Sequence, residues 1–294
     1  MNILVTGGNG QLGCSFREKA ADSGHRFVFA DIRPGGDIVL DVTDLEAVCR
    51  VVDEHDVDVI MNCAAYTDVA RAESEEELAC RINAEAVANM AEAARRKGAV
   101  LIHVSTDYVF DGMSGVPYKE DAPTSPVSAY GRTKLAGEQA VLNSGCRYLI
   151  FRIAWLYSRY GKNFVKTIYE KSTQLPVLKV VCDQVGTPTF AGDLVEFVMN
   201  VIDADMLDRQ GIYNFTNEGV CSWYDLACEI CDMSGHLCEV RPCMTSDYPT
   251  GVRRPFYSVL DKSLVKETFG IDIPYWKDSL RFCLEGLIEN DNNP

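Results

Sequence analysis

The chain has 294 residues, of which 47% are hydrophobic and 24% charged, with a formal net charge of −15 at pH 7. This length is enough for one large α/β domain plus a smaller lobe, and the acidic balance argues against nucleic acid and anionic membrane surfaces as partners. No apolar run approaches the ~18 residues of a membrane span, and no basic leader precedes the first strand. Together with 12 cysteines, these features predict a cytoplasmic protein with free thiols.

Short β-branched runs alternate with helical patterns through the first half of the sequence. The predicted strands are 2–7, 26–31, 37–41, 58–65, 100–105 and 148–154. The predicted helices between them are 11–22, 43–54, 76–97 and 129–144. This alternation predicts a parallel sheet covered by helices, an α/β fold of the Rossmann-type doubly wound kind.

Beyond residue 155 the pattern is less regular. Helices are predicted near 161–173, 191–203, 222–233, 262–269 and 277–289, with one strand at 177–182. We therefore expect a Rossmann domain at 1–154, to which segments at about 177–206 return. Residues 155–176 and 207–294 are expected to form mainly a smaller C-terminal substrate-binding lobe.

A glycine-rich turn, TGGNGQLG, connects the first predicted strand to the first predicted helix. Its glycines provide a tight turn, close backbone approach to a pyrophosphate and close helix–strand packing. The free N–H groups and positive dipole end of the helix attract phosphates. The candidate contacts are Gly7, Gly10, Gln11, Leu12 and Gly13. Their position between a strand and a helix predicts that the Rossmann domain binds NAD(P).

Two residues at the end of the second predicted strand bear on which dinucleotide binds. Asp31 can accept a hydrogen bond from the adenosine ribose 2′-hydroxyl, which favours NAD. Arg33 can instead bind a 2′-phosphate, which favours NADP. The choice between NADH and NADPH stays open.

The remaining cofactor candidates follow the third and fourth predicted strands. They are Asp41, Val42, Ala64, Ala65 and Tyr66. Asp41 and Val42 are placed to flank the adenine, because ligands bind at the carboxyl ends of such strands. The small Ala64 and Ala65 let the backbone approach the cofactor closely, and tight packing is the alternative explanation for them.

A hydroxyl, a phenol and an ammonium converge near the end of the fifth predicted strand. HVSTDYVFDG places Thr106 and Asp107 at that strand end, and SAYGRTKLAG places Tyr130 and Lys134 four residues apart on one helix face. An ammonium beside a phenol favours the phenolate, so we expect Lys134 to lower the pKa of Tyr130 toward the working pH. Thr106 can stabilise charge that develops on a carbonyl oxygen. We interpret the group as an acid prepared for proton transfer; an ordinary surface Tyr and Lys is the alternative.

This hydroxyl–Tyr–Lys set resembles that of the extended short-chain dehydrogenase/reductase superfamily. Within it, segments along nearly the whole chain are similar to the dTDP-4-dehydrorhamnose reductase family. They are NCAAYTDVARAE (62–73), VSTDYVFDG (104–112), SPVSAYGRTKLAGE (125–138), FRIAWLYSRYGKNFV (151–165), DQVGTPT (183–189), YNFTNEGVCSWYDLA (213–227) and RRPFYSVLDKSL (253–264). The resemblance implies reduction of the C4 ketone of dTDP-4-dehydro-L-rhamnose by NADPH or NADH, giving dTDP-L-rhamnose.

The resemblance also implies roles for single residues. Tyr130 donates the proton, Lys134 tunes it and holds the nicotinamide ribose, and Thr106 binds the C4 oxygen. Trp155 lies against the sugar and Asp107 touches substrate. For Trp155 a place in the core is the competing reading, since tryptophan is usually buried somewhere.

Two basic residues, Arg254 and Lys162, are candidates for the substrate diphosphate, with free surface charges as the alternative. Some members of the family bind magnesium at a dimer interface through glutamates. The corresponding segments here, GCSF (13–16) and TPTFAGDL (187–194), lack a matching glutamate. We therefore predict no metal, and either a monomer or a homodimer.

Other functions and sites stay open. A reductase of another dTDP-4-keto-6-deoxysugar has much the same motifs, and a non-catalytic NADP-binding regulatory subunit shares the fold. A related dehydratase is disfavoured because Tyr108 stands where its catalytic glutamate is expected. The cysteines Cys228, Cys231, Cys238 and Cys243 suggest either half of a zinc site or core thiols, and the helical spacing favours the core.

Overall fold

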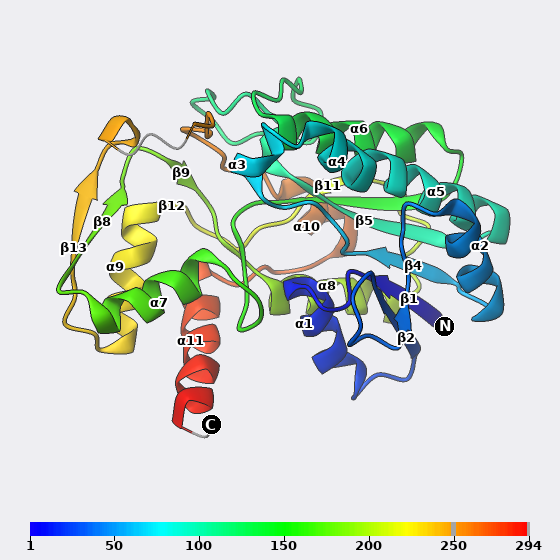
Figure 1. The fold of residues 1–294 in the computed structure, drawn as a ribbon, viewed down its shortest axis with the longest axis horizontal. Coiled ribbons are helices and arrows are strands. Elements are labelled where there is room, and N and C mark those ends of the chain that lie inside the picture. The colour runs from blue at the N-terminus through cyan, green and yellow to red at the C-terminus, as the bar shows by residue number, and fades with distance from the viewer. Residues whose placement is uncertain (248–250, 293–294) are drawn as a thin grey trace.

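The computed structural model describes residues 1–247 and 251–292, so that 248–250 and 293–294 of the expected lobe lie outside the described residues. Its main sheet has seven strands, and each neighbouring pair is parallel (Figure 1). Their order is β11 (Gly211–Asn214), β6 (Arg147–Ile153), β5 (Val100–Thr106), β4 (Val59–Asn62), β1 (Asn2–Thr6), β2 (Arg26–Asp31) and β3 (Ile38–Val39). The predicted Rossmann-type doubly wound fold is confirmed.

Helices cover both faces of this sheet (Figure 1). One face carries α2 (Leu45–Glu54), α5 (Ala86–Lys97) and α6 (Ala129–Asn143). The other carries α1 (Gln11–Ala20), α8 (Ala191–Asp203) and α10 (Ser263–Phe269). Successive strand residues point to opposite faces, so Leu4 packs toward α2 and its neighbour Ile3 toward α1. The sheet is therefore buried on both sides, as parallel sheets require.

The long helix predicted at 76–97 is interrupted. It consists of α4 (Glu76–Cys80), a π-helical turn (Arg81–Glu85) and α5, and it follows the short α3 (Val69–Ala72). Helix α5 ends at Gly98, whose φ of +76° suits glycine. The π-helical turn is relevant to the site, because single turns of this kind are frequent at functional sites.

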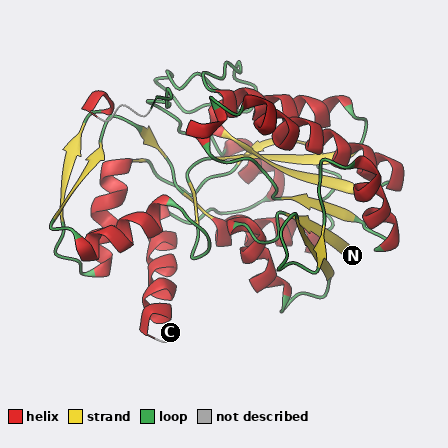
Figure 2. Cartoon of the chain, in the orientation of Figure 1, coloured by secondary structure: helices red, strands yellow, loops and turns green. Residues whose placement is uncertain are grey.

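The smaller lobe is built from α7 (Phe164–Gln174), α9 (Trp223–Ser234) and α11 (Trp276–Asn292), with a two-stranded parallel sheet of β8 (Val177–Val181) and β13 (Glu239–Cys243) (Figures 1 and 2). Short pairs connect it to the main sheet. They are β7 (Leu156–Tyr157) with β10 (Thr189–Phe190), and β9 (Val185–Gly186) with β12 (Cys221–Ser222). No helix among the described residues is long and apolar enough to cross a bilayer.

The cysteines of the lobe are divided between its core and its surface. Cys231 and Cys238 belong to the buried hydrophobic cluster of the lobe, whereas Cys228 and Cys243 are partly exposed. Within the described part of the chain, no three His, Cys, Asp or Glu side chains are grouped as a metal would need. The core reading therefore holds for the two buried thiols.

Two strands depart from the expected division of the chain. We expected residues 177–206 to return to the Rossmann domain, but β8 pairs with β13 in the lobe, and only α8 from that range covers the main sheet. Conversely, β11 lies within the range assigned to the lobe and pairs with β6 at the edge of the main sheet. Both pairings join segments far apart in sequence, which a local hydrophobic pattern does not encode.

Candidate active site

The glycine turn between β1 and α1 is packed too closely for side chains. Gly7 has φ +66°, and a Cβ on it would lie 2.8 Å from the backbone nitrogen of Ala64. A Cβ on Gly13 would overlap the carbonyl oxygen of Gly7. The turn is closed by a 2.9 Å hydrogen bond from the Gly10 N–H to that same oxygen. These contacts explain why Gly7 and Gly13 have no side chain. They also place the end of β4 against the turn.

The start of α1 leaves backbone donors for an anion. Its N-cap is Gly10, and among the described residues no side chain caps the helix. Leu12 is buried in the sheet core. The Gln11 carboxamide oxygen accepts hydrogen bonds from Ser158 at 3.2 Å and Asn163 at 2.9 Å. The Gln11 side chain therefore holds the loop after β7, a contact that the sequence did not reveal.

Asp31 and Arg33 lie together at the end of β2. The Asp31 carboxylate is buried and accepts the N–H groups of Asn9 and Arg33, each at 3.0 Å. The Arg33 guanidinium is 3.8 Å from the same carboxylate, with 76% of its side chain exposed. Asp31 thus supports the backbone of the turn, and the Arg33 guanidinium, paired with Asp31 at one edge, is mostly exposed to solvent.

Beside them, hydrogen bonds from Thr43 lower the pKa of the exposed Asp41, and Val42 packs against the core on the α2 side.

The segment after β4 is held by hydrogen bonds. The Tyr66 N–H donates to the Asn83 side chain at 2.9 Å, and the Tyr66 hydroxyl donates to Glu75 at 2.7 Å. The Ala64 N–H donates to Asn62 at 3.0 Å. The segment Ala64–Tyr66 is therefore fixed by its backbone. Asn83 lies in the π-helical turn, a helical variant that the local pattern does not signal.

Thr106 and Tyr130 meet at the carboxyl edge of the sheet. Thr106 ends β5 and Tyr130 lies in the first turn of α6, and the neighbouring Thr106 hydroxyl acts to lower the pKa of Tyr130. Ser128 caps α6 by accepting the Gly131 N–H at 3.1 Å. A Cβ on Gly131 would overlap the carbonyl oxygen of Tyr108. Glycine at this position therefore lets the helix approach the turn that follows β5.

Lys134 lies one helical turn beyond Tyr130. It is 2% exposed, and its Nζ donates to the Val104 carbonyl at 2.6 Å. Burial lowers the pKa of Lys134 to about 8. Burial also raises the pKa of Tyr130 above its ordinary value. Our expectation that Lys134 lowers the Tyr130 pKa is therefore wrong for this structure, because desolvation of the phenol dominates.

Asp107 is buried beside Thr106, which donates its hydroxyl hydrogen to the Asp107 carboxylate at 2.9 Å. Burial raises the pKa of Asp107 to about 6, although the hydrogen bond from Thr106 opposes the shift.

Tyr108 is an aromatic neighbour of Tyr130. The two rings meet edge to face, with centroids 5.5 Å apart. Burial raises the pKa of Tyr108, and the positive charge of the nearby Arg254 opposes that shift, so Arg254 lies near the same group.

Trp155 follows β6 with a φ of +48° and packs on the first residue of α9, Trp223. Gly186 lies against the same indole, since a Cβ on it would be 2.8 Å from two ring carbons. Trp155 is only partly buried, so both of its proposed roles, packing and substrate contact, are compatible with its position. Lys162 is exposed in the loop that Gln11 holds.

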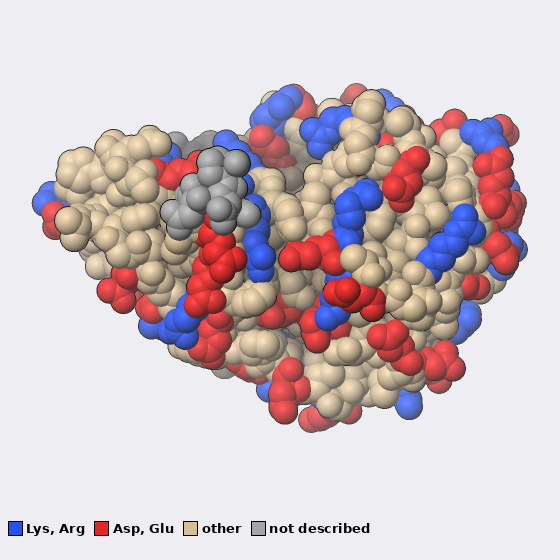
Figure 3. Space-filling view, turned by 90° about the horizontal axis from the view of Figure 1, so that it is seen from below, with Lys and Arg blue, Asp and Glu red and all other residues tan. Residues whose placement is uncertain are grey.

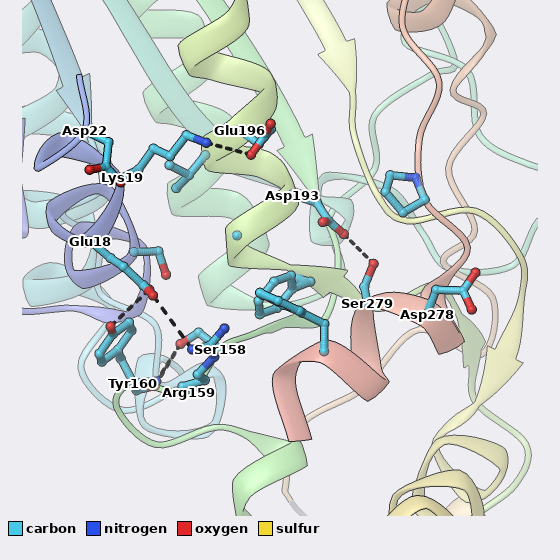
Figure 4. A pocket seen from close by; sticks show the side chains of 16 residues that line it. Glu18, Lys19, Asp22, Ser158, Arg159, Tyr160, Asp193, Glu196, Asp278 and Ser279 are labelled. Atoms are coloured by element: carbon cyan, nitrogen blue, oxygen red, sulfur yellow. Dashed lines mark hydrogen bonds and ion pairs between the residues drawn. The ribbon is translucent and has the colours of Figure 1, made fainter. Parts of the chain in front are cut away.

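A cavity of about 550 Å³ lies elsewhere, between α1, α8, α11 and the loop after β7 (Figure 4). Two of its acidic side chains have partners in the same cavity: Glu196 pairs with Lys19 at 2.9 Å, and Glu18 accepts a hydrogen bond from the Tyr160 hydroxyl at 3.1 Å. Acidic and basic side chains are likewise interspersed over the molecular face in Figure 3. Thr106, Tyr130 and Lys134 do not line this cavity, as far as the described residues show.

The doubly wound sheet, the glycine turn and the Thr–Tyr–Lys group define an NAD(P)-binding oxidoreductase of the short-chain dehydrogenase/reductase class. The family model for the RmlD substrate binding domain matches residues 1–288. A dTDP-4-dehydrorhamnose reductase of Burkholderia thailandensis is 37% identical, covering 98% of this chain and 99% of that one. A probable dTDP-4,6-dihydroxy-2-methyloxan-3-one 4-ketoreductase of Streptomyces antibioticus is 38% identical, covering 100% of this chain and 98% of that one.

A solved structure of the dTDP-4-dehydrorhamnose reductase of Bacillus anthracis, in complex with NADP, superimposes with a TM-score of 0.92. It is 34% identical and covers 97% of this chain and 99% of that chain. The chain therefore belongs to the RmlD family of dTDP-4-dehydrorhamnose reductases.

Proposed function

We propose that this protein reduces the C4 ketone of dTDP-4-dehydro-L-rhamnose with NADPH or NADH, giving dTDP-L-rhamnose for cell-surface polysaccharide synthesis. The observation that carries the proposal is the placement of Thr106 at the carboxyl end of β5 together with Tyr130 in the first turn of α6 and the buried Lys134 one turn further along that helix. A proton donor, a second hydroxyl and a buried ammonium thus converge on one point. Family membership supplies the substrate class.

The residues present fit a dinucleotide. The closely packed glycine turn and the uncapped start of α1 provide space and backbone N–H donors for a pyrophosphate. In this proposal Asp31 and Arg33 bind the adenosine ribose or its 2′-phosphate, and Lys134 binds the nicotinamide ribose. When bound, the reduced nicotinamide supplies the hydride that the carbonyl carbon accepts.

The side chains of the chain perform the proton chemistry. Because burial raises the pKa of Tyr130, the phenol keeps its proton near neutral pH and can donate it to the C4 oxygen. Thr106 then turns its hydroxyl from Asp107 toward the same oxygen and stabilises the negative charge that develops there. The Lys134 ammonium stabilises the phenolate that remains after transfer, and the phenolate regains its proton from solvent.

The substrate contacts complete the proposal. Trp155 and Asp107 lie against the sugar, and Arg254 binds the diphosphate as a charge-assisted donor. Lys162 is the second candidate for the diphosphate. A second function has support from the Streptomyces relative, which is named as a ketoreductase of a different dTDP-sugar. Reduction of another dTDP-4-keto-6-deoxysugar is therefore the alternative.

The test is oxidation of NADPH, and separately of NADH, with dTDP-4-dehydro-6-deoxyglucose in the presence and absence of its 3,5-epimerase. We expect turnover only with the epimerase, and a loss of about 10²–10⁴-fold in Tyr130→Phe. Tyr148→Phe is the matched control, because Tyr148 lies at the opposite, amino end of β6. Turnover without the epimerase would identify a different deoxysugar. Tight NADP binding without any turnover would indicate a regulatory subunit.

We also propose that the protein is cytoplasmic and acts as a monomer or homodimer, without nucleic acid, membrane or metal partners. All 12 cysteines are free thiols, which suits a reducing compartment. Light scattering distinguishes the two oligomeric states. Unchanged turnover after treatment with a chelator is expected if no metal is used.

A further inference from the structure

A buried acid lies directly behind the proposed Tyr–Lys pair. Glu138 follows Lys134 by four residues on α6, so the two side chains share a helix face. Glu138 is 1% exposed and Lys134 is 2% exposed. A carboxylate buried this deeply is costly unless it is paired and hydrogen-bonded.

Two neighbouring strands supply those partners. Arg152 on β6 binds Glu138 through both ends of its guanidinium, with Nε to Oε1 at 2.9 Å and Nη2 to Oε2 at 2.7 Å. Ser105 on β5 donates its hydroxyl to the same Oε1. Ser105 directly precedes Thr106 in the chain, so the carboxylate joins both elements that present the proposed acid and its hydroxyl partner.

Arg152 is itself fixed. Its Nη1 donates to the Glu120 carbonyl at 2.9 Å, and its guanidinium lies 5.1 Å from the centroid of the Phe110 ring. The group therefore links β5, α6, β6 and the segment before α6 in one buried network. A bidentate arginine–carboxylate pair has a defined geometry, so it restricts how α6 can rotate or slide relative to β5.

The charges that face Lys134 come from several elements. On α6, Glu138 favours the ammonium. After β4, desolvation raises the pKa of the partly buried Cys63 thiol, so it stays neutral. On β5, the buried His103 has its pKa lowered and accepts a 3.0 Å hydrogen bond from Asn62 through Nδ1, so it also stays neutral. Glu138 is thus the anion that offsets the burial of Lys134.

We propose that Glu138, held by Arg152 and Ser105, is a positioning residue that keeps Lys134 charged and in place beside Tyr130. Its effect on turnover rests on the proposed reductase function; its effect on Lys134 does not. The competing explanation is a structural ion pair that only stabilises the fold. The two explanations differ in one respect, because only the first requires the proton affinity of Lys134 to depend on the charge of Glu138.

The experiment measures that affinity directly. Protein labelled with ¹³C at the lysine ε-carbon is titrated by NMR, and the Lys134 signal is assigned by its disappearance in Lys134→Arg. For the wild-type protein we expect a midpoint near pH 8. In Glu138→Gln, which preserves the side-chain shape, the midpoint should fall by about one pH unit or more. Glu76→Gln is the matched control, since it breaks an exposed pair with Arg132 on the same helix and should leave the midpoint unchanged.

A double variant, Glu138→Met with Arg152→Met, removes the carboxylate together with its guanidinium partner and replaces the pair with apolar groups, a change that buried pairs often tolerate. If Glu138→Gln does not fold, the double variant should still lower the midpoint, because it lacks the carboxylate on the helix of Lys134. In the reductase assay, the kcat/KM profile against pH should move in parallel with the midpoint. An unchanged Lys134 midpoint in a folded variant that lacks the carboxylate would overturn the proposal, whether or not the enzyme reduces this sugar.

Discussion

Trp155 and Trp223 stack face to face, with ring centroids 3.6 Å apart and planes inclined by 12°. Trp155 is the second residue beyond the end of β6 and has a left-handed backbone, a conformation that costs energy for a bulky residue. Trp223 is the first residue of α9 in the lobe. The stack therefore joins the main sheet to the lobe and fixes the indole that we propose for sugar binding.

Removal of Trp223 should weaken substrate binding more than it slows the chemical step. An aromatic pair contributes about 0.5–1.5 kcal/mol beyond its buried area, so Trp223→Ala should raise the KM for the dTDP-sugar about threefold to tenfold with little change in kcat. Steady-state kinetics with saturating NADPH measures both parameters. Trp223→Phe retains an aromatic face and should restore most of the affinity. An unaltered KM in Trp223→Ala would show that Trp155 does not need this support.

Thr106 should matter for turnover and not for cofactor binding. Its hydroxyl donates to Asp107 at 2.9 Å in this structure and is placed to turn toward the C4 oxygen. Thr106→Val removes the donor at nearly constant volume, so we expect kcat to fall about 10²-fold. NADPH affinity, measured by fluorescence, should be unchanged. Thr106→Ser keeps the hydroxyl and should have near-normal activity. Normal turnover by Thr106→Val would show that another group stabilises the charge on the C4 oxygen.

The buried Asp107 should make stability depend on pH. Its pKa is raised from 3.8 to about 6 by burial, so the folded protein binds the proton more tightly than the unfolded chain. The resulting stabilisation is fully present below pH 3.8 and is lost as pH rises to about 6, a change of about 3 kcal/mol.

Asp107→Asn removes that titration. Urea unfolding at pH 4 and pH 7 should therefore show the variant gaining stability relative to the wild-type protein at the higher pH. The other carboxyl groups titrate alike in both proteins, so their contribution cancels when the two free energies of unfolding are subtracted. A constant difference across this range would contradict the raised pKa.

Gly13 should be intolerant of any side chain. A Cβ there would overlap the carbonyl oxygen of Gly7, so Gly13→Ala should distort the turn and abolish measurable NADPH binding. Gly24→Ala is the control, because a Cβ at Gly24 meets no atom within 4 Å among the described residues. Fluorescence titration of NADPH compares the two variants, and circular dichroism tests that both fold. Normal binding by Gly13→Ala would place the pyrophosphate away from this turn.

Arg33 should distinguish the two cofactors. Its exposed guanidinium is available to a 2′-phosphate, and a hydrogen bond to a charged group contributes about 1.5–3 kcal/mol. Arg33→Ala should therefore weaken NADPH binding about tenfold or more and leave NADH binding unchanged. Arg26→Ala, which removes an exposed arginine at the opposite, amino end of β2, controls for net charge. Equal losses for both cofactors would mean that Arg33 does not recognise the phosphate.

Local sequence determined much of the dinucleotide site and the proposed acid. The glycine turn is defined by residues adjacent in the chain, and the 6–13 segment contains both the strand end and the helix start. Tyr130 and Lys134 share a face because helical geometry places residues four apart together. The parallel sheet follows from alternating strand and helix patterns, whose periods are also local. Such features need no knowledge of distant contacts.

Only the tertiary structure decided the rest. The pairing of β8 with β13 and of β11 with β6, the Trp155–Trp223 stack and the Glu138–Arg152 pair all join segments whose approach is set by packing of the whole chain. The pKa of Tyr130 illustrates the physical reason. Spacing places a cation near the phenol, but the depth of burial sets the desolvation cost, and burial is a property of the folded molecule that no local pattern contains.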